Sequence, residues 1–236
     1  MTNNLFGDKR KNAFIIITLI AQIIAIFADF LLGFLATELV AESFAFLMKT
    51  LFNSIPSLIL SLLPSVIFIL HFVFLNKESK IKKFFIPVYF AYSAIKATLG
   101  VIASAKSFFV NINSHFTLTF LGSFFLNLIS LTALIFLFIG SLNNFKFLKL
   151  FRTGALIYIV FTVCVVISSF INLINTPIMP SFSNYNNLIS YINWNSVVKL
   201  IILISFYVGL FILTFNKEKN VPTIDNETEE TLKTNE

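Results

Sequence analysis

The sequence predicts an all-α membrane protein, a polytopic transmembrane helical bundle of six spans with both ends in the cytoplasm. Hydrophobic residues make up 57% of the 236 residues and charged residues 12%, whereas a soluble domain carries about 25% charged residues. Six apolar stretches approach or exceed the roughly 20 residues that cross a bilayer as a helix. Connections that are rich in Lys and Arg alternate with connections that are poor in them, as expected when successive loops lie on opposite sides of a membrane. These three observations together favour the six-span bundle.

The spans follow one another with short connections. A polar, basic N-terminal tail covers residues 1–12. The apolar stretch at 13–36 is longer than the roughly 7–15 residues of a signal-peptide core, so it is predicted to be an uncleaved first span. The polar, finally acidic residues 216–236 predict a disordered cytoplasmic tail. The other spans are predicted at 56–76, 84–104, 117–141, 154–175 and 197–215.

The distribution of Lys and Arg predicts the orientation. Twelve basic residues fall in the N-terminal tail, in the even-numbered connections and just after the sixth span, and three fall in or beside the odd-numbered connections. Cytoplasmic loops carry the excess of Lys and Arg, so the richer side is predicted to be cytoplasmic and the protein to lie in a cell membrane, here a bacterial inner membrane. The richer set is Lys9, Arg10, Lys11, Lys77, Lys80, Lys82, Lys83, Lys146, Lys149, Arg152, Lys217 and Lys219, and the poorer set is Lys49, Lys106 and Lys199.

The first outer connection, residues 37–54, has a helical pattern of its own. Val40, Phe44, Leu47 and Leu51 recur at spacings of three and four, which is the period of one helix face. This pattern predicts an amphipathic helix that lies at the outer interface or extends the first span beyond the membrane.

The spacing of the spans also allows an internal repeat. The odd-numbered spans begin near residues 13, 84 and 154, which is a period of about 70 residues. Each unit would be one helical hairpin, so three hairpins would make up the bundle. Evenly spaced spans with short inner loops produce the same spacing without any repeat, so both interpretations stay open.

Asp29 and Lys96 are the candidate buried polar pair. Both lie well inside predicted spans, at roughly 24 and 18 Å along their helices. An ionisable side chain in hydrocarbon costs at least about 2.5–3.5 kcal/mol, so it usually faces protein or water. The two spans run in the same direction, so a salt bridge is possible if they are neighbours. The pair would either bind a solute or relay protons in a polar cavity, or form a neutral bridge that fixes the helix register.

Further polar residues recur on the same helical stripes as small residues. Such stripes mark the helix–helix face of membrane helices, and they also line polar cavities. The candidate cavity-lining residues are Gln22, Ser93, Asn127 and Asn172.

The motifs that the sequence lacks limit its function. It contains no H-E-x-x-H, G-x-S-x-G, P-loop or C-x-x-C motif, so we expect neither enzymatic activity nor a bound cofactor or metal. The basic residues at helix ends indicate contact with the lipid bilayer and no binding of nucleic acid. The expected function is small-solute transport, as a transporter or as a permease or binding subunit with a separate ATPase or other membrane subunit. The alternative is a non-transporting membrane protein such as an immunity, assembly or sensor component.

Overall fold

The computed structural model describes residues 9–40, 43–74, 82–110, 117–175 and 183–218, and every regular element in these ranges is an α-helix. All six helices are long and apolar enough to cross a membrane. The predicted all-α class and six apolar helices are therefore confirmed, whereas the orientation across the membrane stays a prediction. The helices are α1 (Lys9–Val40), α2 (Phe44–Val73), α3 (Lys82–Val110), α4 (Thr117–Phe145), α5 (Leu148–Asn175) and α6 (Ser183–Glu218).

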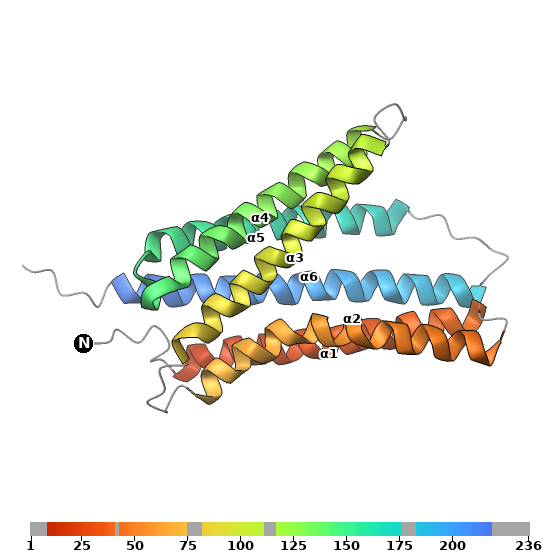
Figure 1. Cartoon of the computed structure of the whole chain (residues 1–236), viewed down its shortest axis with the longest axis horizontal. Helices are drawn as coiled ribbons and strands as arrows, with labels where there is room; N and C mark the ends of the chain where they lie inside the picture. The colour runs from red at the N-terminus through yellow and green to blue at the C-terminus, as the bar shows by residue number, and fades with distance from the viewer. Residues whose placement is uncertain (1–8, 41–42, 75–81, 111–116, 176–182, 219–236) are drawn as a thin grey trace, which may run out of the picture.

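The helices form a closed ring in chain order. Each helix packs against the helices that precede and follow it, and α6 returns to pack against α1. Successive helices run in opposite directions, so α1 begins and α6 ends at the same end of the ring (Figure 1). Among the described residues α1 and α3 make no packing contact. The three candidate hairpins, α1–α2, α3–α4 and α5–α6, are each pairs of neighbours in this ring, and whether they are true repeats stays a prediction.

A cluster of large apolar side chains closes the ring at the end where α1 begins. Phe68 packs edge-on against Phe206, with ring centroids 5.2 Å apart, and against Tyr89 at 5.0 Å. The contributing residues come from the first halves of α1, α3 and α5 and the second halves of α2, α4 and α6, which places them at one end. We call this cluster the aromatic core: Ile15, Leu19, Phe68, Ile86, Tyr89, Phe90, Leu134, Leu137, Phe145, Phe151, Ala155, Phe206, Tyr207, Leu210 and Leu213.

Glycines bring the helices close together at the same end. A Cβ on Gly154 of α5 would lie 2.8 Å from the carbonyl oxygen of Ala133 in α4, and one on Gly140 of α4 would lie 2.5 Å from the backbone nitrogen of Phe151. Small residues allow such close backbone approach between membrane helices. In contrast, a Cβ on Gly33, near the other end of α1, would meet nothing within 4 Å.

The outer segment 37–54, predicted as an amphipathic helix at the interface or as an extension of the first span, is shared between α1 and α2 in its described residues. Residues 37–40 continue α1, and α2 begins at Phe44 and runs without interruption to Val73. Ser43 provides the reason for the new start, because its Oγ accepts a hydrogen bond from the backbone N–H of Phe46 at 3.3 Å and caps the helix. The residues of this segment therefore lengthen the first helix at its end and the second helix at its start, on the outer side of their most apolar stretches.

The helix ends also extend beyond the predicted spans. The helix α5 begins at Leu148 instead of residue 154, and α6 begins at Ser183 instead of residue 197. Hydropathy detects only the part that suits hydrocarbon, whereas backbone hydrogen bonding continues into polar sequence. Of the predicted N-terminal tail, residues 9–12 are helical, and the predicted disordered tail falls largely outside the described residues.

Candidate functional site

The ring encloses a cavity of about 610 Å³ that touches side chains from all six helices. It lies next to the aromatic core, toward the middle of the ring, and fifteen of its twenty-three lining residues carry a polar side chain. This polarity matters because the exterior of the same helices is covered by exposed Ile, Leu, Val and Phe side chains. The polar lining residues are Gln22, Asp29, Ser54, Ser57, Ser61, Ser65, Tyr89, Tyr92, Ser93, Lys96, Asn127, Ser130, Tyr158, Lys199 and Tyr207.

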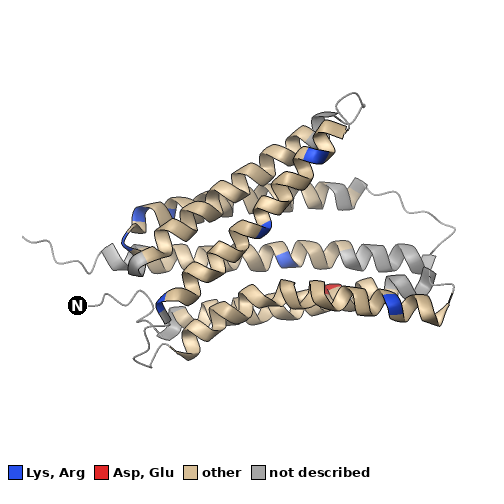
Figure 2. Ribbon diagram, in the orientation of Figure 1, with Lys and Arg blue, Asp and Glu red and all other residues tan. Residues whose placement is uncertain are grey.

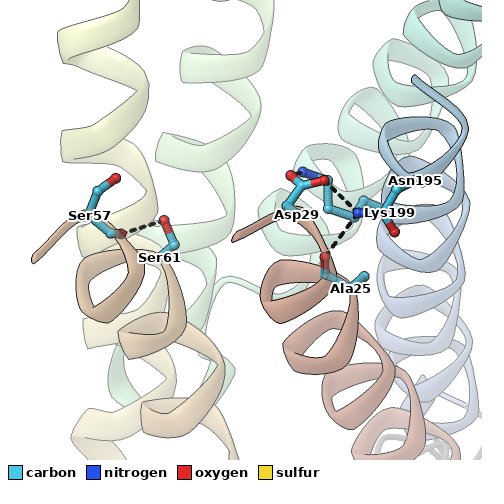
Figure 3. Close-up of polar contacts among 6 residues, drawn as sticks. All are labelled: Ala25, Asp29, Ser57, Ser61, Asn195 and Lys199. Atoms are coloured by element: carbon cyan, nitrogen blue, oxygen red, sulfur yellow. Dashed lines mark hydrogen bonds and ion pairs between the residues drawn. The ribbon is translucent and has the colours of Figure 1, made fainter. Parts of the chain in front are cut away.

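An ion pair between α1 and α6 forms one wall of the cavity. The ammonium group of Lys199 pairs with Oδ2 of Asp29, and the side-chain amide of Asn195 donates hydrogen bonds to Oδ1 of Asp29 and, at 3.1 Å, to the carbonyl oxygen of Ala25 (Figure 3). The Lys199 and Asp29 side chains are 30% and 31% exposed, so the pair is accessible from the cavity and is not sealed in the interior.

This pair corrects the partner that the sequence suggested for Asp29. The expected bridge to Lys96 required α1 and α3 to be neighbours, but the ring places α6 beside α1 and α2 between α1 and α3. In the sequence Lys199 indicates only the orientation, because it lies at the start of the sixth predicted span. Lys199 follows Asn195 by four residues in the sequence, and this spacing places both side chains on one helix face.

Lys96 lies on a different wall of the same cavity. It sits fourteen residues from each end of α3, its side chain is exposed, and it lines the cavity. Among the residues that the structure describes, it forms no ion pair or hydrogen bond. The charged lining residues of the described part are therefore one carboxylate and two ammonium groups, which leaves an excess of one positive charge. In Figure 2 basic residues gather at the end of the ring where α1 begins, and single charged residues are scattered along the rest of the helices.

Three serines of the lining use their hydroxyl protons on carbonyl oxygens of their own helices. Ser61 donates to the carbonyl oxygen of Ser57 at 2.8 Å (Figure 3), and Ser93 donates to that of Tyr89 at 2.9 Å. Ser54 likewise donates to the carbonyl oxygen of Leu51 at 2.8 Å. A hydroxyl whose proton is used within its own helix still has two acceptor lone pairs. These walls therefore present hydrogen-bond acceptors to anything inside the cavity.

A proline in α2 explains the link between α2 and α3. Pro64 has no N–H, so the carbonyl oxygen of Leu60, four residues earlier, loses its helical partner. The hydroxyl of Tyr92 in α3 donates to this oxygen at 2.7 Å. The link closes the cavity wall between two helices and satisfies a backbone group that the proline left without a donor.

The floor of the cavity is formed by tyrosines of the aromatic core. The rings of Tyr158 and Tyr207 lie 4.2 Å apart, measured between centroids, and Tyr89 and Tyr207 are almost fully buried. Tyr158 lines the cavity together with Ser130 and Tyr207. The polar cavity thus ends on tyrosine side chains that adjoin the aromatic core.

The structure places most of the candidate lining residues at the cavity. Gln22 lines it and accepts a hydrogen bond from Ser65 at 3.5 Å. Ser93 lines it from α3, and Asn127 lines it from α4 while donating to Ser104 at 2.5 Å. Asn172 belongs to α5, but its side chain falls outside the described part of the structure.

The lining of the cavity combines charged, hydroxyl and amide groups. Within the described ranges no three His, Cys, Asp or Glu side chains gather in a way that would hold a metal ion. The lining offers two ammonium groups, one carboxylate that is already paired, and a series of hydroxyl and amide groups, all of which are able to form hydrogen bonds. Comparison with models of protein families, with curated proteins and with solved structures finds no match to this chain.

Proposed function

We propose that the protein binds a small polar solute in the cavity of the helix ring and moves it across the membrane. The observation that carries this proposal is the cavity itself, about 610 Å³ in volume and lined by polar groups from all six helices. Ligand pockets typically measure about 300–1,000 Å³. Ionisable groups within a membrane usually mark solute or ion pathways, and Asp29, Lys96 and Lys199 all line this cavity.

In this proposal the basic end of the ring faces the cytoplasm of a bacterial cell, as the distribution of Lys and Arg favours. The aromatic core would then separate the cavity from the cytoplasm, and the solute would enter from the opposite end. Transport by alternating access would require the aromatic core to open, with α6 and α3 moving because they carry the facing aromatic residues. A separate ATPase or other membrane subunit would contact the basic connection at 143–152.

A non-transporting role is the second candidate, and the closed core favours it. A cavity closed at one end by interlocking aromatic rings also suits a protein that binds a solute and reports its presence. The two functions differ in one outcome, since a sensor binds the solute without letting it pass the membrane.

Replacing a glycine that lines the cavity by a large residue tests both functions. Gly100 lines the cavity, and a Cβ there would meet only Asn127, at 3.7 Å, so Gly100→Leu is expected to fold and to obstruct the space. Gly122→Leu is the matched control, because Gly122 is exposed, does not line the cavity, and would meet nothing within 4 Å. Purified variants in lipid vesicles would be compared for swelling in gradients of small polar solutes.

We expect flux with the unmodified protein and with Gly122→Leu, and its loss with Gly100→Leu. Binding without flux would favour the sensor function. Equal flux in both variants would show that any solute path lies outside this cavity.

A further inference from the structure

We infer that the solute of this cavity is a small hydroxylated carboxylate whose anionic group binds Lys96, an inference that rests on the proposed function. It names the substrate class and assigns separate tasks to the two lysines. Lys199 is already neutralised by Asp29, which is also held by Asn195. Lys96 lines the same cavity, and the described residues offer it no carboxylate.

The position of Lys96 excludes the usual alternative for a lysine in a membrane helix. A lysine near a helix end can extend its ammonium group to the headgroups along an apolar surface. Lys96 is fourteen residues from either end of α3, which is roughly 21 Å of helix. A four-carbon side chain cannot bridge that distance, so the ammonium group has the cavity as its polar surroundings.

An unpaired cation at this depth needs an anion or water. A charge in a membrane interior is costly, and it is stabilised by a partner or by a water-filled cavity. A solute with a single negative charge would neutralise the excess positive charge of the described lining. A neutral solute would leave that charge in place, and a cation would add to it.

The walls near Lys96 indicate the rest of the solute. Ser61 and Ser93 each use their hydroxyl proton on a carbonyl oxygen of their own helix, so they offer acceptor oxygens to the cavity. Tyr92 uses its hydroxyl proton on the carbonyl oxygen of Leu60 in the neighbouring helix α2, so its oxygen is an acceptor as well. Acceptors of this kind bind the O–H groups of a ligand. A carboxylate that carries several hydroxyl groups satisfies both Lys96 and these oxygens.

The test uses gluconate, with sorbitol as its neutral counterpart of similar size and tetramethylammonium as a cation. The full chain is purified into nanodiscs of phosphatidylcholine, and affinity is obtained from the shift in melting temperature with ligand concentration. Lys96→Gln removes the charge and Lys96→Arg keeps it. Lys106→Gln is the matched control, because Lys106 lies on the same helix, is exposed and does not line the cavity.

We expect gluconate to stabilise the unmodified protein and Lys106→Gln, and sorbitol and tetramethylammonium to have no comparable effect. Lys96→Gln should weaken gluconate binding by about tenfold or more, since a hydrogen bond to a charged group is lost. Lys96→Arg should retain most of it. The melting temperature of Lys96→Gln without ligand checks that the variant is folded, and removal of an unpaired charge should not lower it.

Three results would overturn the inference. Equal stabilisation by sorbitol, unchanged in Lys96→Gln, would mean that the solute is neutral, while binding in the cavity would stand. Failure of gluconate to bind would exclude this carboxylate class, and the comparison of Gly100→Leu with Gly122→Leu would decide the proposed function separately. If phosphatidylglycerol in the nanodisc stabilises the protein through Lys96 and gluconate does not compete, the anion is a lipid headgroup and not a soluble acid.

Discussion

Replacing Asp29 by asparagine removes the carboxylate that pairs with Lys199 and leaves that ammonium group without its counter-ion in the cavity wall. The shape of the side chain and its contact with Asn195 are largely kept, so the change isolates the charge. Breaking a buried pair by removing one partner costs about 3–5 kcal/mol, whereas an exposed pair contributes about 0–1 kcal/mol.

The observed exposure places this pair between those limits. Its side chains are 30% and 31% exposed, so we expect Asp29→Asn to lower the free energy of unfolding by about 1–3 kcal/mol. Lys199→Met should destabilise by a similar amount. The double variant should lose clearly less than the sum of the two, because the second change removes a charge that the first left unpaired.

The assay is reversible unfolding in mixed micelles, followed by circular dichroism. Lys96→Met combined with Asp29→Asn is the control, because Lys96 lies on the opposite side of α2 from α1 and makes no ion pair with Asp29 within the described residues. Its effect should simply add to that of Asp29→Asn. The reasoning is refuted if the change at Lys199 is additive with Asp29→Asn, or if the change at Lys96 restores stability.

Three further changes test the packing of the ring. Tyr92→Phe should cost about 0.5–1.5 kcal/mol by removing the hydrogen bond to the exposed carbonyl group of Leu60, and this cost should shrink in a Pro64→Ala background, where the helix regains its own N–H. An equal cost in both backgrounds in micelle unfolding would contradict the link. Gly154→Ala should destabilise by about 1–3 kcal/mol through overpacking, with Gly33→Ala neutral or slightly stabilising, and equal melting temperatures would contradict the close α4–α5 crossing. Phe206→Ala should lower stability by about 3–5 kcal/mol and make vesicles that contain the protein leak small solutes, and intact vesicles would contradict the role of the aromatic core as the barrier.

The helices were predictable from the sequence because their signal is local. A run of apolar residues long enough to cross hydrocarbon identifies a span without reference to the rest of the chain. The stripes of small and polar residues were also local, and Gln22, Ser93 and Asn127 do line the cavity. The exact helix ends were harder to predict, because polar residues such as those at the start of α6 continue a helix that hydropathy no longer detects.

The identity of neighbours was not predictable in the same way. Depth in the membrane made Lys96 a plausible partner for Asp29, but depth is shared by every helix that crosses the bilayer. The order of helices around the ring decides which lysine Asp29 meets, and that order brings α6 beside α1. The bond from Tyr92 to Leu60 depends on the same information. Pro64 signalled in the sequence that a carbonyl would be left free, but not which residue would bind it.

The measurement that tests the central claim most directly is the accessibility of the cavity to water from one side. In a Cys164→Ser background, single cysteines are placed at Ser61, which lines the cavity, and at Ile59, which is 58% exposed on the same helix and does not line it. A membrane-impermeant thiol reagent is then applied to right-side-out and inside-out vesicles, since only a water-exposed thiolate reacts.

A polar cavity entered from the end opposite the aromatic core predicts labelling of Ser61→Cys from the outer side only, and no labelling of Ile59→Cys from either side. Protection of Ser61→Cys on both sides, or its labelling only from the side of the basic connections, would contradict it.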